Sequence, residues 1–208
     1  MKLKKKTKKA LVIIIVLLFI LLGVLVFLNF FGDRKSVKEV KIVNKIDKYG
    51  YNLKENKPSK YKKLFDELKK VLNENEVDEE KYVSKISEMF IYDFYSLNDK
   101  TAKTDIGGVD FVYNEVLENF LLNAEDTYYK YIENNIYGNR NQSLPTVDEI
   151  EVKEVKQEAF AYGDKTDDKA YKVSVEWTYT DSEFSKYQTS ATLVFIHDGE
   201  KLCLVELQ

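Results

Sequence analysis

The chain has little of the chemistry on which many active sites and metal centres depend. Its 208 residues include one cysteine, one histidine, one tryptophan and two prolines. A single cysteine excludes an intramolecular disulfide framework. One histidine and one cysteine cannot complete the usual four-ligand zinc shell. Nucleophilic catalysis by this pair would need a nucleophile held beside a base, which requires the two side chains to meet.

His197 and Cys203 are predicted to lie on neighbouring strands of one hairpin. The dipeptide Asp198-Gly199 is typical of a tight turn between antiparallel strands. In that register His197 pairs with Glu200 and Cys203 pairs with Val194, which puts the two side chains roughly 10 Å apart. We therefore expect no catalytic dyad, and we interpret Cys203 as a core residue.

Other ligand-binding patterns are also missing. Asp164, Asp167 and Asp168 form an acidic loop without the spacing or the closing glutamate of an EF-hand. Gly107-Gly108 lacks the further glycines and the lysine of a P-loop, so we expect it to permit an unusual backbone turn. Asp93 is the one carboxylate that we place near an apolar helix face. The sequence predicts no catalytic residue, no cofactor and no metal site, although paired carboxylates stay possible because acidic residues are abundant.

One long apolar run, from Ala10 to Phe31, contains no charged side chain. As a helix it is about 33 Å long, against about 30 Å for the hydrocarbon core of a bilayer. A cleaved signal peptide has a shorter apolar region and small residues at its cut site, and this run has neither feature. We predict a transmembrane helix over residues 10–31 that is retained as an anchor.

The charges on the two sides of this run differ in sign. Six lysines lie in residues 1–9, which leaves 26 basic against 35 acidic residues, a net charge of −9, for residues 32–208. Basic flanks stay on the cytoplasmic side, so we expect 1–9 to be a cytoplasmic tail and the rest to be extracytoplasmic. A body with this charge repels nucleic acid. The expected partners are the lipid bilayer, spanned once, and another envelope protein or a second copy.

Beyond the membrane, residues 32–58 are interpreted as a stalk with a short extended segment, and 59–208 as the folded domain. Apolar residues first recur every three or four positions, which predicts helices over 60–72, 79–97 and 109–134, with Ser59 and Asp78 as helix caps. From Thr146 the period changes to two, which predicts strands over 150–160, 171–180, 188–197 and 201–207. Helices followed by strands predict an α+β domain in which about three helices pack on a four-stranded antiparallel sheet.

This order of elements over 59–208 resembles the NTF2-like superfamily, in which helices fold over a curved antiparallel sheet. With a basic tail and one membrane anchor ahead of the domain, the chain resembles the VirB8-like components of conjugation machines. The resemblance implies a cavity between helices and sheet, and it transfers no functional residue. The chain also resembles uncharacterised membrane-anchored proteins of AT-rich bacteria. The stretches Lys48-Tyr49-Gly50-Tyr51 and Asp105-Ile106-Gly107-Gly108-Val109 are the ones by which relatives would be sought.

Aromatic residues are abundant, at 13% of the chain. Tyr and Trp are enriched at interfaces, so a cluster of them is a candidate pocket or binding face, with ordinary core packing as the alternative. The candidate residues are Tyr128, Tyr131, Tyr171, Trp177 and Tyr179. We hypothesise a non-catalytic, membrane-anchored binding or assembly module of the bacterial cell envelope. The alternatives are a VirB8-like component of a transfer machine and an envelope hydrolase that uses carboxylates.

Overall fold

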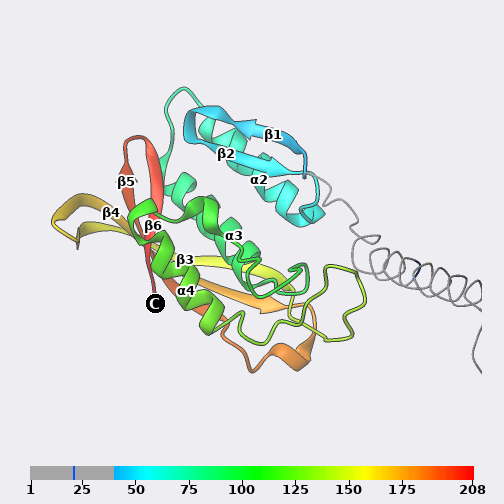
Figure 1. Cartoon of the computed structure of the whole chain (residues 1–208). Coiled ribbons are helices and arrows are strands. Elements are labelled where there is room, and N and C mark those ends of the chain that lie inside the picture. The colour runs from blue at the N-terminus through cyan, green and yellow to red at the C-terminus, as the bar shows by residue number, and fades with distance from the viewer. Residues whose placement is uncertain (1–20, 22–39) are drawn as a thin grey trace, which may run out of the picture. The chain divides into compact units, whose positions relative to one another are not determined.

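A computed structural model of the chain describes Leu21 and residues 40–208 (Figure 1). The predicted tail and most of the predicted transmembrane helix lie outside the described residues. Within the described part, no helix has the length and apolar character needed to cross a membrane. Residues 41–208 form one unit.

The unit is an α+β fold in which three helices precede a four-stranded antiparallel sheet, as the sequence predicts. A hairpin of two short strands comes first. Three single-turn 3₁₀ helices occur at Asp47–Tyr49, Val109–Phe111 and Ser182–Phe184. The other elements are β1 (Ile42–Ile46), β2 (Tyr51–Lys54), α2 (Ser59–Leu72), α3 (Glu79–Tyr95), α4 (Asn114–Asp126), β3 (Val147–Tyr162), β4 (Lys165–Tyr179), β5 (Ser190–Asp198) and β6 (Lys201–Leu207).

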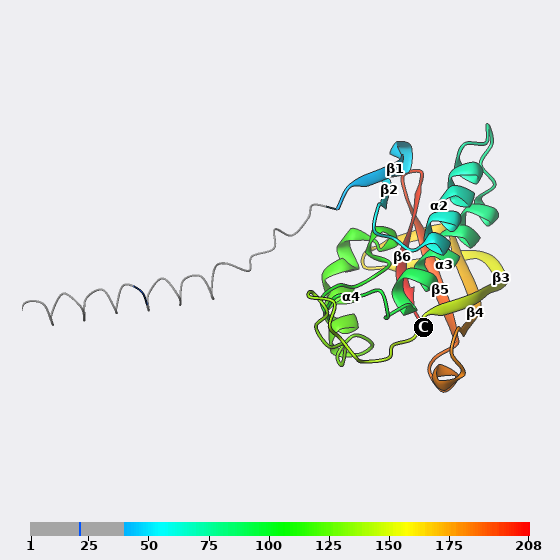
Figure 2. The ribbon, with the colours of Figure 1, turned by 90° about the vertical axis from the view of Figure 1, so that its right-hand side faces the viewer.

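Helix α3 lies at the centre of the unit, with α2 on one side and strands β3 and β4 on the other (Figures 1 and 2). The Asp78 carboxylate caps α3 by accepting the Lys81 N–H at 3.1 Å, as predicted. Residues 89–95 are all buried, so this half of α3 has no solvent-facing stripe. Helix α2 buries only one face. Its predicted cap is wrong, because Ser59 is the first helical residue and Pro58 precedes it without a side-chain hydrogen bond.

The first hairpin packs into the same core. Tyr51 on β2 is almost completely buried, and its hydroxyl lies 2.7 Å from that of Tyr82 on α3. The Tyr82 hydroxyl also accepts the Leu202 N–H of β6 at 3.1 Å. These hydrogen bonds satisfy buried polar groups and join three elements that are distant in the sequence.

Helix α4 is much shorter than the predicted 109–134, since a 3₁₀ turn at Val109–Phe111 precedes its start at Asn114 and it ends at Asp126. The apolar period continues past this point, but Thr127 leaves the helical conformation, and the Tyr129 N–H bonds back to the Ala124 carbonyl. Tyr129 is fully buried, and its hydroxyl donates to the Phe94 carbonyl at 2.6 Å. Tertiary packing of one tyrosine therefore overrides the local helical pattern.

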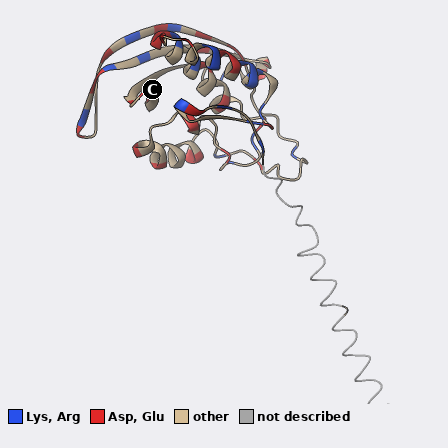
Figure 3. Cartoon of the chain, turned by 90° about the horizontal axis from the view of Figure 1, so that it is seen from above, with Lys and Arg blue, Asp and Glu red and all other residues tan. Residues whose placement is uncertain are grey.

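The sheet has the order β3-β4-β5-β6, a simple meander. Its last hairpin differs from the predicted register, because Asp198 pairs with Lys201 and the two loop residues are Gly199 and Glu200. β3 and β4 are the longest strands, and their far end extends as an arm that carries Lys and acidic residues along both strands (Figure 3).

Candidate functional site

A pocket of about 300 Å³ lies where α3 ends, beside the segment after α4 and the connection between β4 and β5. Ligand pockets are typically concave and apolar with a few polar groups, and this volume is at the lower end of their range. None of the side chains that line the pocket is charged. They are Tyr95, Leu97, Tyr128, Tyr131, Ile132, Gln142, Leu144, Pro145, Tyr179, Tyr187 and Gln188.

Hydrogen bonds of Tyr129 and Gln142 hold the segment after α4, and they position two of the lining tyrosines, Tyr128 and Tyr131. The buried Tyr129 hydroxyl donates to the Phe94 carbonyl and accepts the Gly107 N–H at 3.0 Å. Gln142 holds the next turn, because its amide nitrogen donates to the Tyr131 carbonyl at 2.8 Å. With Tyr129 inside, its neighbour Tyr128 and Tyr131 are left on the outer side.

Two buried polar atoms without hydrogen-bond partners lie at and beneath the pocket: one belongs to Tyr95, which lines it, and the other to Trp177, which packs against Tyr95. Tyr95 packs on Trp177 with ring centroids 4.4 Å apart, and both side chains are almost fully buried. Among the described residues, no hydrogen bond reaches the Tyr95 hydroxyl or the Trp177 Nε1. Burial raises the pKa of Tyr95, so its hydroxyl stays protonated. An unpaired buried donor costs roughly 1–3 kcal/mol, which is unusual in a structural core.

The rim is organised around Gln188. The Tyr128 hydroxyl donates to the Gln188 side-chain oxygen, and the Tyr179 hydroxyl donates to the Gln188 backbone carbonyl at 2.7 Å. Burial raises the pKa of Tyr179, which therefore also remains neutral. Tyr131 and Tyr187 complete the rim, with 77% and 53% of their surface exposed. The rim thus offers aromatic area and neutral hydrogen-bonding groups together.

The five residues singled out from the sequence fall into three places. Tyr128, Tyr131 and Tyr179 line the pocket. Trp177 lies beneath it, against Tyr95. Tyr171 is elsewhere, where its hydroxyl donates to the Glu79 carboxylate at 2.9 Å.

Sequence reasoning missed Tyr95, Tyr187 and Gln188. Tyr95 is the last residue of α3 and lies off the apolar stripe that marks the helix, and Tyr187 follows a 3₁₀ turn without periodicity. Gln188 is the first residue of the strand predicted over 188–197, and the strand itself begins at Ser190. Only their local density of tyrosine distinguishes these positions in the sequence.

Asp93 is part of a buried ion-pair network outside the pocket. Its carboxylate accepts hydrogen bonds from Lys57, from Lys100 at 3.0 Å and from the Gly108 N–H at 2.9 Å. Burial alone would raise its pKa, but the charges of Lys100 and Lys57 and the Gly108 N–H outweigh burial and lower the pKa to about 2. Asp93 is therefore held as a charged anchor for the loop after α3.

Gly107 and Gly108 are needed for this anchor. A Cβ on Gly107 would lie 1.9 Å from the Asp93 carbonyl oxygen. Gly108 has φ +76°, and a Cβ there would lie 2.6 Å from the Phe90 ring. The double glycine lets the loop approach α3 closely enough for Asp93 to accept the Gly108 N–H.

The histidine and the cysteine do not meet. His197 pairs with Leu202 and Cys203 with Ile196, in place of the predicted Glu200 and Val194. Cys203 is buried in the core, and the His197 ring Nδ1 lies 2.8 Å from the Asp167 carboxylate. In the described part of the chain, no group of three or more His, Cys, Asp or Glu residues is arranged to hold a metal ion.

A wider and more open hollow lies beside α2 and the sheet, and it contains glutamates. Glu151 and Glu176 both pair with Lys153, and Glu88 pairs with Lys85. The side chains of Glu151 and Glu176 are mostly exposed, and ion pairs of this kind are typical of a solvated surface.

Comparison with protein families, curated proteins and solved structures finds no match for this chain.

Proposed function

We propose that the chain is a non-catalytic binding module of the bacterial cell envelope, held by a single membrane anchor, that binds another envelope protein through its aromatic pocket. The observation that carries this proposal is the neutral pocket rimmed by Tyr128, Tyr131, Tyr179 and Tyr187. Tyrosines give large contact area and a hydroxyl with little loss of side-chain freedom, which is why they dominate protein-binding surfaces. A partner that inserts an apolar or aromatic side chain would also cover the exposed rings of the rim.

The unpaired Tyr95 hydroxyl supports binding in this place. The ring of Tyr95 packs against the ring of Tyr128 in an edge-to-face arrangement, with the ring centroids 5.5 Å apart. A small movement of Tyr128 would open the Tyr95 donor to a carbonyl or hydroxyl of the partner. The free energy lost by leaving this donor unpaired in the folded chain would then be recovered on binding.

The membrane part of the proposal rests on the apolar run of residues 10–31 and on the lysines that precede it. A fusion of alkaline phosphatase after Gln208 is expected to be active, because this enzyme is active only when exported. An inactive fusion, together with an active cytoplasmic reporter at the same position, would reverse the proposed orientation.

The pocket is tested by comparing tyrosines of equal exposure. Tyr131 lines the pocket and is 77% exposed, whereas Tyr137 does not line it and is 74% exposed. Crosslinking in membranes followed by mass spectrometry would first identify the partner or a second copy. Tyr131→Ser combined with Tyr187→Ser should reduce recovery of that partner at least tenfold, and Tyr137→Ser should not. Equal recovery from both variants would remove the pocket from the proposal.

A VirB8-like component of a transfer machine is the alternative that the order of elements favours, since three helices precede a four-stranded meander. This alternative predicts neighbouring genes for a coupling ATPase and a relaxase. The carboxylate hydrolase has less support, because three glutamates of the open hollow are paired with lysines. Hydrolysis of envelope glycans by the purified full-length chain would restore it.

A further inference from the structure

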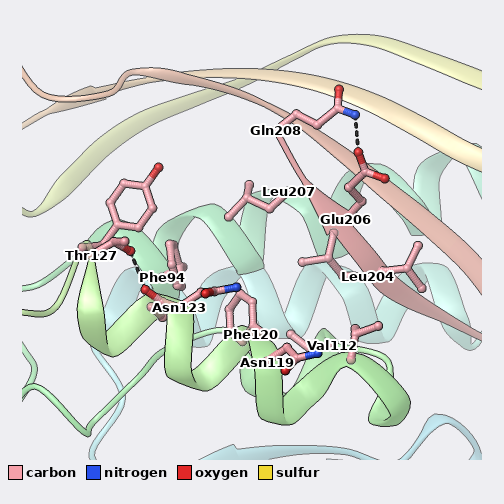
Figure 4. Close-up of a pocket in the computed structure, with 14 residues that line it drawn as sticks. Phe94, Val112, Asn119, Phe120, Asn123, Thr127, Leu204, Glu206, Leu207 and Gln208 are labelled. Atoms are coloured by element: carbon pink, nitrogen blue, oxygen red, sulfur yellow. Dashed lines mark hydrogen bonds between the residues drawn. The ribbon is translucent and has the colours of Figure 1, made fainter. Parts of the chain in front are cut away.

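A second groove, of about 360 Å³, lies between α4 and the last strand β6 (Figure 4). Its floor is apolar and is formed mainly by Phe94, Phe120, Leu204 and Leu207. The groove differs from the aromatic pocket in one respect: one of its walls is the edge of a β-sheet. A sheet edge presents backbone donors and acceptors in addition to side chains.

Near the middle of β6, a backbone group on the outer edge of the strand has a hydrogen-bond partner. Near the end of β6, the outer edge has none among the described residues. The Tyr113 N–H donates to the Leu204 carbonyl at 2.8 Å, and Val112 forms a parallel bridge with Leu204. The chain then turns away into α4. The edge has thus accepted one short backbone partner and leaves the stretch after Leu204 without one.

The open stretch is centred on Leu207. Thr192 of β5 and the residue after Leu207, Gln208, exchange both of their backbone hydrogen bonds. Directions alternate along an antiparallel strand, so the N–H and C=O of Leu207 face away from β5. In the part of the chain that the structure describes, no hydrogen bond reaches these two outward groups. A peptide strand is the ligand that such a pair of groups fits best.

The opposite wall of the groove, formed by α4, carries side chains that can hydrogen-bond to the second edge of a bound peptide strand. Asn119 and Asn123 lie four residues apart on α4 and both line the groove. Figure 4 shows Asn123 on the side of α4 that faces β6. Neither carboxamide has a hydrogen-bond partner among the described residues. A carboxamide both donates and accepts, as does the second edge of an extended peptide backbone.

Charge indicates which peptide would fit. Helix α4 carries four acidic residues and no basic one. Glu115 and Glu125 already pair with lysines, whereas Glu118 and Asp126 have no ion-pair partner within residues 40–208. Glu206 is the one charged residue of the lining. Glu118 and Asp126 are not part of the lining, so the acidic rim is the part beside Glu206, which complements lysine or arginine.

The other edge of the sheet is protected. β3 has three irregularities in its pairing with β4 and carries Glu and Lys along its exposed side. Bulges and charges of both signs are the usual devices that prevent strand addition. β6 has a single irregularity in its pairing with β5, between Leu204 and Glu206, and Leu207 itself pairs regularly with Leu193.

We propose that the groove between α4 and β6 binds a short extended segment of a partner protein by strand addition at Leu207. Apolar side chains of the segment would face the floor at Phe120 and Leu204, and its Lys or Arg side chains would face the acidic rim. The second edge of the segment would be held by Asn119 and Asn123. The groove and the aromatic pocket adjoin at Tyr128, which lines both, but they have no other lining residue in common, and neither proposal depends on the other.

The test uses the full-length chain, purified in detergent, and three end-blocked hexapeptides. The basic probe has the sequence KVKFKV, and the acidic probe EVEFEV has the same apolar residues. The third probe is the basic one with alternate backbone amides methylated, so that it cannot form a strand ladder. The proposal expects the basic probe to bind at least tenfold more tightly than each of the other two. Equal affinity for the basic and the methylated probe, or for the basic and the acidic probe, would overturn it, as would the absence of binding.

Hydrogen exchange locates the contact. Binding of the basic probe should slow exchange of the Leu207 amide at least tenfold, because the amide gains an acceptor. Asn119→Ala with Asn123→Ala should weaken binding about tenfold. The matched control Asn75→Ala lies in the exposed turn between α2 and α3 and should change nothing. Tyr187→Ser should also leave this affinity unchanged, which separates the groove from the aromatic pocket. Unaltered Leu207 exchange in the bound state, or full binding by the double Asn variant, would contradict strand addition.

Discussion

Replacement of Asp93 by asparagine is the sharpest single test of the folding account. Asp93→Asn keeps the size of the side chain and removes its charge, which leaves the Lys100 ammonium without its main counterion. The side chains of Asp93 and Lys100 are only 8% and 4% exposed. Breaking one side of a buried ion pair costs roughly 3–5 kcal/mol. Because Asp99 remains 2.9 Å from Lys100, we expect the lower end, about 3 kcal/mol at neutral pH.

The same substitution should remove the part of the acid-induced loss of folding stability that comes from protonation of Asp93. The pKa of Asp93 falls from its ordinary value of 3.8 to about 2 in the folded chain. At about 1.36 kcal/mol per pKa unit, the difference contributes roughly 2 kcal/mol. A lowered carboxyl pKa stabilises the fold above the unfolded pKa, and this stability is lost as the pH falls from 3.8 towards 2. The difference in the free energy of unfolding between the unsubstituted chain and Asp93→Asn should thus narrow from about 3 kcal/mol at neutral pH to about 1 kcal/mol near pH 2.

Urea unfolding of the full-length chain provides the assay, and the single buried Trp177 gives the fluorescence signal. Asp126→Asn is the matched control, because this carboxylate is exposed and should change stability by less than about 0.5 kcal/mol. The reasoning would be refuted by an Asp93→Asn effect as small as that of the control. It would also be refuted by a gap that stays constant from neutral pH to pH 2.

Three further predictions follow from buried contacts. Gly107→Ala should destabilise the fold by roughly 3 kcal/mol or more, measured by thermal unfolding, because its Cβ would collide with the Asp93 carbonyl. Tyr82→Phe leaves the buried Leu202 N–H without an acceptor and should cost about 1–3 kcal/mol in urea unfolding; a change near zero would disprove that contact. Burial raises the pKa of the Cys203 thiol, so a thiol reagent should modify the folded chain only as fast as it unfolds; immediate reaction would contradict its place in the core.

The sequence predicted the elements that local patterns specify. The change of period at Thr146 separated helices from strands, and the Asp78 cap was found because capping chemistry is local. The end of α4 was missed, because burial of Tyr129 against Phe94 ends the helix where the apolar period continues. Local sequence patterns do not show which side chain is buried in the core.

The candidate site was predictable only in part for the same reason. The sequence identifies a density of tyrosines near residue 128, and the fold joins them to Tyr95 and Tyr187, which lie about 30 and 60 residues away along the chain. The predicted register of the last hairpin was wrong, because the turn lies one residue further along the chain. Cys203 therefore pairs with Ile196 and not with Val194. Neither the pocket nor the open edge at Leu207 follows from periodicity, because each arises where distant elements meet.

Photocrosslinking from the pocket in native membranes tests the central proposal most directly. Tyr187→p-benzoylphenylalanine places the reactive group at the pocket rim, and the same replacement of Tyr162 places it at the tip of the β3–β4 arm. We predict one defined crosslinked partner from position 187 that is lost when Tyr131→Ser is added, and no such product from position 162. The same product from both positions, or no product from position 187 at native expression, would contradict a binding function for the aromatic pocket.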